Sequence, residues 1–83
     1  MEITELINET EKYISGSDSE HYKSLAEMIL RELKNIKKNE NYIVPASVMH
    51  SLIDSFDIYS DYWKKYFFKY WDSNPSKFEN PYE

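Results

Sequence analysis

The chain has 83 residues, of which 41% are hydrophobic, and a formal net charge of −5. A chain of this length forms one domain with a thin core, because it hides only about 60% of the surface that its unfolded form exposes. The absence of cysteine excludes a disulfide framework and thiolate metal sites. The acidic balance disfavours direct binding to the phosphates of nucleic acids.

Apolar residues recur at helical spacing through the first half of the chain, and the single glycine leaves little support for strands joined by tight turns. We predict a first helix over about residues 3–15, capped at its end by Gly16. A second helix follows to about Lys38, with Ser17 and Glu20 spaced as a capping box at its start. The predicted inner faces consist of Ile3, Leu6, Ile7, Thr10 and Ile14, with Tyr13 at the edge, and of Tyr22, Leu25, Ala26, Ile29, Leu30, Leu33 and Ile36.

The third helix is predicted to begin after Pro45, whose ring suits a first helical turn and biases Val44 toward an extended backbone. An apolar stripe stays in phase from Val48 to Trp71 at about 100° per residue. We therefore favour one helix over about residues 46–72, which would be about 40 Å long at a rise of about 1.5 Å per residue. A break between residues 57 and 61 is the alternative, because Ser and Asp are poor interior residues of a helix.

These elements predict an all-α fold, a small antiparallel three-helix bundle that becomes a four-helix bundle if the last helix breaks. The helical domain covers residues 1–72. Residues 73–83 contain two Asn-Pro steps and are predicted to form an extended C-terminal tail. Phe78 and Tyr82 are available to fold back from this tail onto the body.

Residues 59–71 hold eight of the fourteen aromatic side chains. We assign Trp63, Phe67 and one of Tyr66 or Tyr70 to the core. The rings together cover more than half of the helix circumference, whereas packing on one side needs a stripe of about 100°. Because Tyr and Trp are favoured at protein interfaces, the surplus rings are predicted to bind a partner. The candidate rings are Tyr59, Tyr62, Tyr66, Phe68, Tyr70 and Trp71.

Several surfaces could cover these rings: the tail, a second copy of the chain, or another protein. Membrane association is a further possibility, because Lys64, Lys65 and Lys69 flank the rings in an interfacial pattern. Three bases in an acidic chain are too few to favour that interpretation. We expect no direct contact with a membrane.

Two acidic stripes accompany the rings at spacings of three or four residues. Their plain interpretation is a solvated helix surface, with Asp61 paired to Lys65. The alternative is a carboxylate array that binds the arginines and lysines of a basic partner protein in the place of phosphates. The candidate carboxylates are Glu2, Glu5 and Glu9 on the first helix and Asp54, Asp57 and Asp61 on the third.

Catalytic and metal-binding motifs are missing from the sequence. His50 with Asp54, and Glu20 with His21, could each supply two metal ligands, but no third ligand is indicated. The sequence has no phosphate-cradling loop, nucleophile turn or convincing acid–base pair. We therefore expect a protein that is not an enzyme and holds no metal or cofactor.

The leading interpretation is a non-enzymatic protein-binding module that inhibits or regulates a basic partner. In size, acidity and aromatic content the chain is similar to nuclease-immunity proteins, antitoxins and phage-encoded inhibitors, although no residue motif of theirs matches it. Nine lysines to one arginine are typical of an AT-rich genome, such as that of a low-GC bacterium or its phages. The N-terminus lacks a secretory signal, so we expect a cytoplasmic protein. The alternative is a structural homodimer that uses the ring surface for self-association.

Overall fold

The structure, a computed structural model, describes residues 2–54 and 61–81, except for the side chains of Ile53 and Asp54. Four α-helices and no β-strand lie within these residues, which confirms the all-α class. A π-helical turn, Trp63–Phe67, runs directly into the last α-helix, and a 3-10 turn, Pro75–Lys77, follows it. The α-helices are α1 Ile3–Gly16, α2 Glu20–Lys38, α3 Ala46–Asp54 and α4 Phe68–Ser73.

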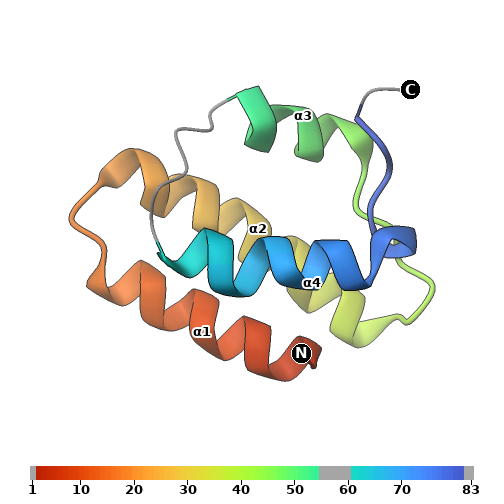
Figure 1. Cartoon of the computed structure of the whole chain (residues 1–83), viewed down its shortest axis with the longest axis horizontal. Helices are drawn as coiled ribbons and strands as arrows, with labels where there is room; N and C mark the ends of the chain where they lie inside the picture. The colour runs from red at the N-terminus through yellow and green to blue at the C-terminus, as the bar shows by residue number, and fades with distance from the viewer. Residues whose placement is uncertain (1, 55–60, 82–83) are drawn as a thin grey trace.

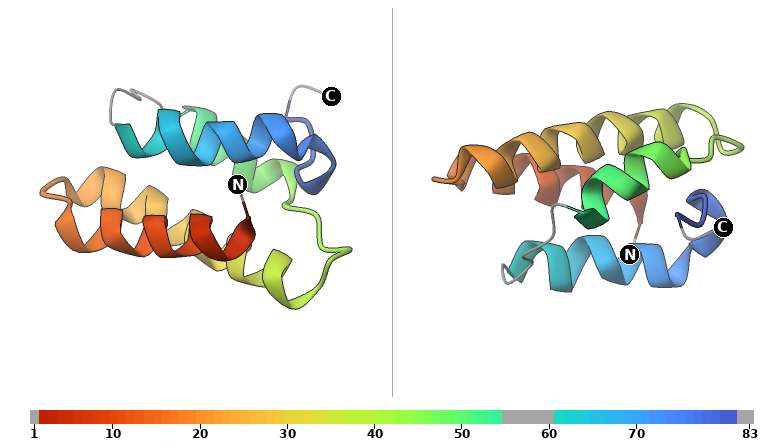
Figure 2. Two further views of the ribbon diagram at one scale, coloured as in Figure 1. Left: turned by 60° about the horizontal axis from the view of Figure 1, so that its bottom comes forward. Right: turned by 90° about the horizontal axis from the view of Figure 1, so that it is seen from above.

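The helices enclose one core. α1 and α2 lie side by side as a hairpin (Figure 1), and the helical segment over residues 61–73 faces this hairpin from the other side (Figure 2). α3 closes one side between them. The largest of the fully buried side chains come from every one of these parts: Leu6, Thr10, Ile29, Leu33, Val44, Met49, Leu52, Trp63 and Phe67.

The turn between α1 and α2 differs from the predicted capping. Ser19, not Ser17, caps α2, because its hydroxyl oxygen accepts a hydrogen bond from the backbone N–H of Tyr22 at 3.3 Å. The Ser17 hydroxyl accepts one from the backbone N–H of Ser19 at 3.3 Å, which shapes the turn. Gly16 has no positive φ and is the last residue of α1, so the glycine cap is wrong. The predicted bounds of both helices are otherwise confirmed to within a few residues.

The single helix predicted over residues 46–72 is wrong. α3 ends at Asp54, and the helical segment that begins at Asp61 runs back in the opposite direction, as the colours of Figure 1 show. Two separate helical segments agree with the alternative of a four-helix bundle, whereas the predicted position of the break, between residues 57 and 61, lies almost wholly outside the described residues. Trp63 and Phe67 occupy the core as predicted.

The C-terminal residues are not simply an extended tail, since α4 continues to Ser73 and a 3-10 turn follows. Phe78 then forms an isolated parallel bridge with Val44. The Val44 N–H donates to the Lys77 carbonyl, and the Glu79 N–H donates to the Val44 carbonyl, both at 2.9 Å. Val44 is extended ahead of Pro45, as predicted, and Phe78 folds back onto the body. The corresponding prediction for Tyr82 lies outside the described residues.

Phe78→Ala should lower the free energy of unfolding by about 3 kcal/mol, because it removes a ring that is only 6% exposed and leaves a cavity beside Phe67. Urea denaturation followed by circular dichroism measures the change. Ser76→Ala, at an exposed position of the same segment, should stay within about 0.5 kcal/mol of wild type. A loss below about 1 kcal/mol for Phe78→Ala would show that the tail contributes little to the core.

Candidate functional site

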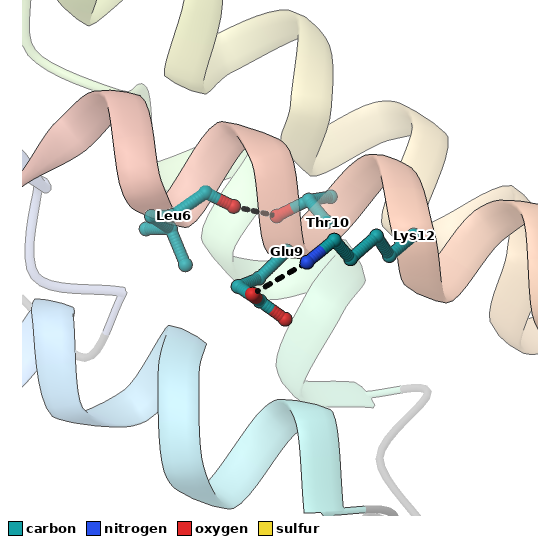
Figure 3. A network of polar contacts seen from close by, with 4 residues as sticks. All are labelled: Leu6, Glu9, Thr10 and Lys12. Atoms are coloured by element: carbon teal, nitrogen blue, oxygen red, sulfur yellow. Dashed lines mark hydrogen bonds and ion pairs between the residues drawn. The ribbon is translucent and has the colours of Figure 1, made fainter.

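Tyr62, one of the rings predicted to bind a partner, packs inside the molecule. Its ring stacks on Tyr13 of α1 with centroids 4.6 Å apart, and its hydroxyl lies 2.6 Å from the Thr10 hydroxyl. Thr10 donates its own proton to the Leu6 carbonyl at 2.7 Å (Figure 3), so Tyr62 must be the donor to Thr10. The pair joins the segment over residues 61–73 to α1 through a buried polar contact.

The expectation that Tyr62 is exposed is wrong, since it is only 5% exposed. Tyr70 is also 5% exposed, which agrees with the assignment of one of Tyr66 or Tyr70 to the core but leaves little of its ring for a partner. The prediction for Tyr62 failed because residues 63–67 form a π-helical turn, in which the backbone N–H of Phe68 donates to the Trp63 carbonyl, five residues back. The extra residue in this turn shifts the phase of the helix, so a uniform projection of 100° per residue fails here. Tyr70 is covered by the tail, where Phe78 meets it edge-on at 6.1 Å.

Three of the predicted rings keep part of their surface exposed: Tyr66, Phe68 and Trp71. Phe68 and Trp71 stack with centroids 6.2 Å apart and an interplanar angle of 25°. Trp71 also forms one wall of a hollow of about 360 Å³ at the junction of α4 and the tail. We call this the aromatic hollow; it is lined by Trp71, Pro75, Phe78, Asn80 and Pro81. Tyr59 lies outside the described residues.

The acidic stripe of α1 is present on the surface. Glu2 and Glu5 are exposed, and neither forms an ion pair with another described side chain. Both lie at the start of α1, where the helix dipole itself favours carboxylates. Glu9 is different: its side chain is 25% exposed, and Lys12 pairs with it at 3.3 Å (Figure 3). The free carboxylates of this face are therefore Glu2 and Glu5.

Only Asp61 of the second predicted acidic stripe has a described side chain. Asp61 is exposed and lies 3.8 Å from Lys65, one turn along, as the interpretation of a solvated surface predicted. Asp57 and the side chain of Asp54 lie outside the described residues. A pair this exposed contributes little stability, about 0.5 kcal/mol or less.

One polar contact was missed by the sequence analysis. Glu32 on α2 is 9% exposed, and the Tyr42 hydroxyl donates a hydrogen bond to its carboxylate. This hydrogen bond to a carboxylate is the main cause that raises the pKa of Tyr42. Glu32 shares the helical face of Ile29 and Ile36, three and four residues away, which was the signal for its burial. The contact fixes the loop after α2 to the helix.

Within the described part of the chain, no three His, Cys, Asp or Glu side chains gather in a way that could hold a metal ion. No helix in that part is long and apolar enough to cross a membrane. Comparison of the chain with protein-family models, with curated proteins and with solved structures finds no match. Functional inference therefore depends on the surface of this molecule alone.

Tyr62→Phe should lower the free energy of unfolding at neutral pH by about 1 kcal/mol, because one buried hydrogen bond is lost while the Thr10 hydroxyl keeps the Leu6 carbonyl as acceptor. Chemical denaturation measures this change. Tyr66→Phe, which removes a hydroxyl from a half-buried ring, should change it by less than about 0.5 kcal/mol. Equal losses in the two variants would contradict a specific role for the Tyr62–Thr10 contact.

Stability should fall at alkaline pH. Burial raises the pKa of Tyr62 well above its ordinary value, an effect that the Thr10 hydrogen bond reduces in part. The protonated phenol is thus favoured in the folded state, so its contribution is full below pH about 10 and is lost as pH rises from there toward the folded-state pKa. Unfolding free energies measured from pH 8 to pH 11 should fall less steeply for Tyr62→Phe than for wild type. Identical slopes would contradict the burial of this phenol.

Proposed function

We propose that this small antiparallel helical bundle is a non-enzymatic protein-binding module, which inhibits or regulates a basic partner protein in the cytoplasm. The observation that carries the proposal is the aromatic hollow together with the half-buried ring of Phe68 stacked on Trp71. The tail contacts the rings of Tyr70 and Phe67, which are buried. It leaves the rings of Phe68 and Trp71 partly exposed to water. Partly exposed aromatic side chains beside an apolar hollow are typical anchors for a partner's side chain.

The position of the acidic face supports a basic partner. α1 begins at the end of the molecule at which α4 and the tail meet, as both Figure 1 and Figure 2 show. One partner could therefore reach Glu2, Glu5 and the aromatic hollow together. The rings would supply most of the binding free energy, while the carboxylates would speed the encounter with a basic surface.

The first experiment is a pull-down with the tagged chain from lysate of its own organism, followed by identification and purification of the retained protein. Phe68→Ala and Trp71→Ala should each weaken binding to that purified protein by more than about 1 kcal/mol in calorimetry. Tyr66→Ala is the matched control, because Tyr66 is a half-buried ring that stacks on Tyr62 and neither lines the aromatic hollow nor stacks on Trp71 as Phe68 does. Equal effects of all three variants would contradict the assignment of the binding surface.

Recovery of the chain alone would favour the alternative function, a homodimer that uses the same rings for self-association. Analytical ultracentrifugation separates the two possibilities, because a dimer that survives high salt has buried the rings against a second copy. Circular dichroism of each variant shows whether a loss of binding reflects loss of the fold.

The charge of the α1 face has its own test. Glu2→Lys/Glu5→Lys should lower the association rate with the purified partner about tenfold at low salt and flatten its salt dependence, because charge complementarity acts mainly on encounter. Stopped-flow or surface plasmon resonance measures the rate. Glu20→Lys/Glu27→Lys reverses two exposed carboxylates of α2, away from the aromatic hollow, and should have a smaller effect. An unchanged salt slope in the first variant would remove the argument for a basic partner.

A further inference from the structure

A second hollow lies on a different part of the surface, between the middle of α1 and the last turns of α2. Its volume is about 570 Å³, and it is separate from the aromatic hollow, with which it shares no residue. Ile7 is only 6% exposed at its base, and Asn8 provides a side-chain amide. We call it the lysine groove; it is lined by Ile7, Asn8, Glu11, Lys34, Lys37 and Lys38.

The lysine groove is locally basic in an acidic protein. Lys34, Lys37 and Lys38 are all exposed, and within the described residues none of them lies in an ion pair with a carboxylate. Glu11 is the one acidic residue of the lining, so three positive charges face one negative charge. At physiological salt, charges are screened beyond about 8 Å, so a ligand in the groove experiences this local charge and not the net charge of the chain.

Helix termination explains only part of this arrangement. Lys37 and Lys38 belong to the last turn of α2, where basic side chains are favoured by the negative end of the helix dipole. Lys34 precedes that turn, where the effect of the dipole has fallen off. Its spacing of three and four residues from the other two places all three on one side of the helix, facing the hollow.

We infer that the lysine groove binds an acidic peptide segment of a partner protein, one that carries an apolar side chain between its carboxylates. Lysine ammonium groups on long flexible stems can each meet a separate carboxylate along an extended peptide. The Asn8 amide can bond to the peptide backbone, and the methylene stems of the lysines, together with the small exposed part of Ile7, can contact the apolar side chain.

A compact phosphate is a poorer ligand for this groove. The groove has no arginine fork, and the helix end beside it is the C-terminal end of α2, whereas compact phosphate sites use arginine forks or the N–H groups at a helix start. A long nucleic acid would also extend onto the acidic surface of α1. An acidic peptide needs no convergent phosphate site, because each lysine can meet a separate carboxylate, and it is short enough to stay within the groove.

The test uses a fluorescein-labelled peptide, Glu-Asp-Leu-Glu-Asp-Leu-Glu, and the full chain, with anisotropy to measure affinity. A matched peptide with Gln and Asn in place of Glu and Asp carries the same dye and should bind at least about tenfold more weakly. In ¹⁵N-labelled protein, the acidic peptide should shift the amide resonances of the groove residues and leave those of the aromatic hollow in place.

Lys34→Gln/Lys37→Gln should lower the affinity for the acidic peptide at least about tenfold. Lys65→Gln/Lys69→Gln removes the same charge from exposed positions on the other side of the molecule, and its affinity should stay within about twofold of wild type. Circular dichroism confirms that both variants fold. Equal weakening by the two lysine pairs, no shift of the groove amides, or tighter groove binding by a short inorganic polyphosphate than by the peptide would each overturn the inference. None of these outcomes depends on the partner of the aromatic hollow.

Discussion

The ring of Phe67 is the contact on which the rest of this fold depends. It has no exposed surface, and it meets rings from its own helical segment and from the tail. Removing it would leave the π-helical turn, α4 and the tail without a shared packing partner. A thin core of this kind tolerates few such losses, because the whole domain is stabilised by only several kcal/mol. The ring contacts of Phe67 are with Trp63, Phe68, Trp71 and Phe78.

The first two helices could be predicted from the sequence because each is a simple amphipathic helix whose apolar spacing alone decides which side is buried. The rest depended on contacts between distant residues. A stripe from Val48 to Trp71 remains in phase whether the helix is straight or folded back on itself, so periodicity could not distinguish the two. The π-helical turn then moved Tyr62 inward, where the hydroxyl of Thr10, far away in sequence, was available to accept its hydrogen bond.

The candidate surfaces also divide into those that local sequence predicts and those that depend on contacts between distant residues. Exposed carboxylates at the start of α1 follow from helical spacing alone. The aromatic hollow requires the tail to return to α4, and the lysine groove requires α1 to lie against the end of α2; neither pairing is encoded in local sequence. α1 thus carries an acidic outer face and one wall of a basic groove, and under the two proposals these opposite charges would select different segments of partner proteins. Such specificity depends on the local charge of each surface, because the net charge of −5 predicts neither the free carboxylates of α1 nor the basic groove.

Because of the bridge between Val44 and Phe78, hydrogen exchange of one backbone amide can report the opening of the core. Amides near the end of a chain usually exchange with solvent within moments, because terminal segments fray at almost no cost in free energy. The Glu79 amide is close to the C-terminal end of the described chain, yet it is bonded to the carbonyl of a fully buried residue. Its deuterium uptake is therefore tied to the opening of the core itself, and the same amide would report, in a single resonance, any ligand that stabilises the closed form.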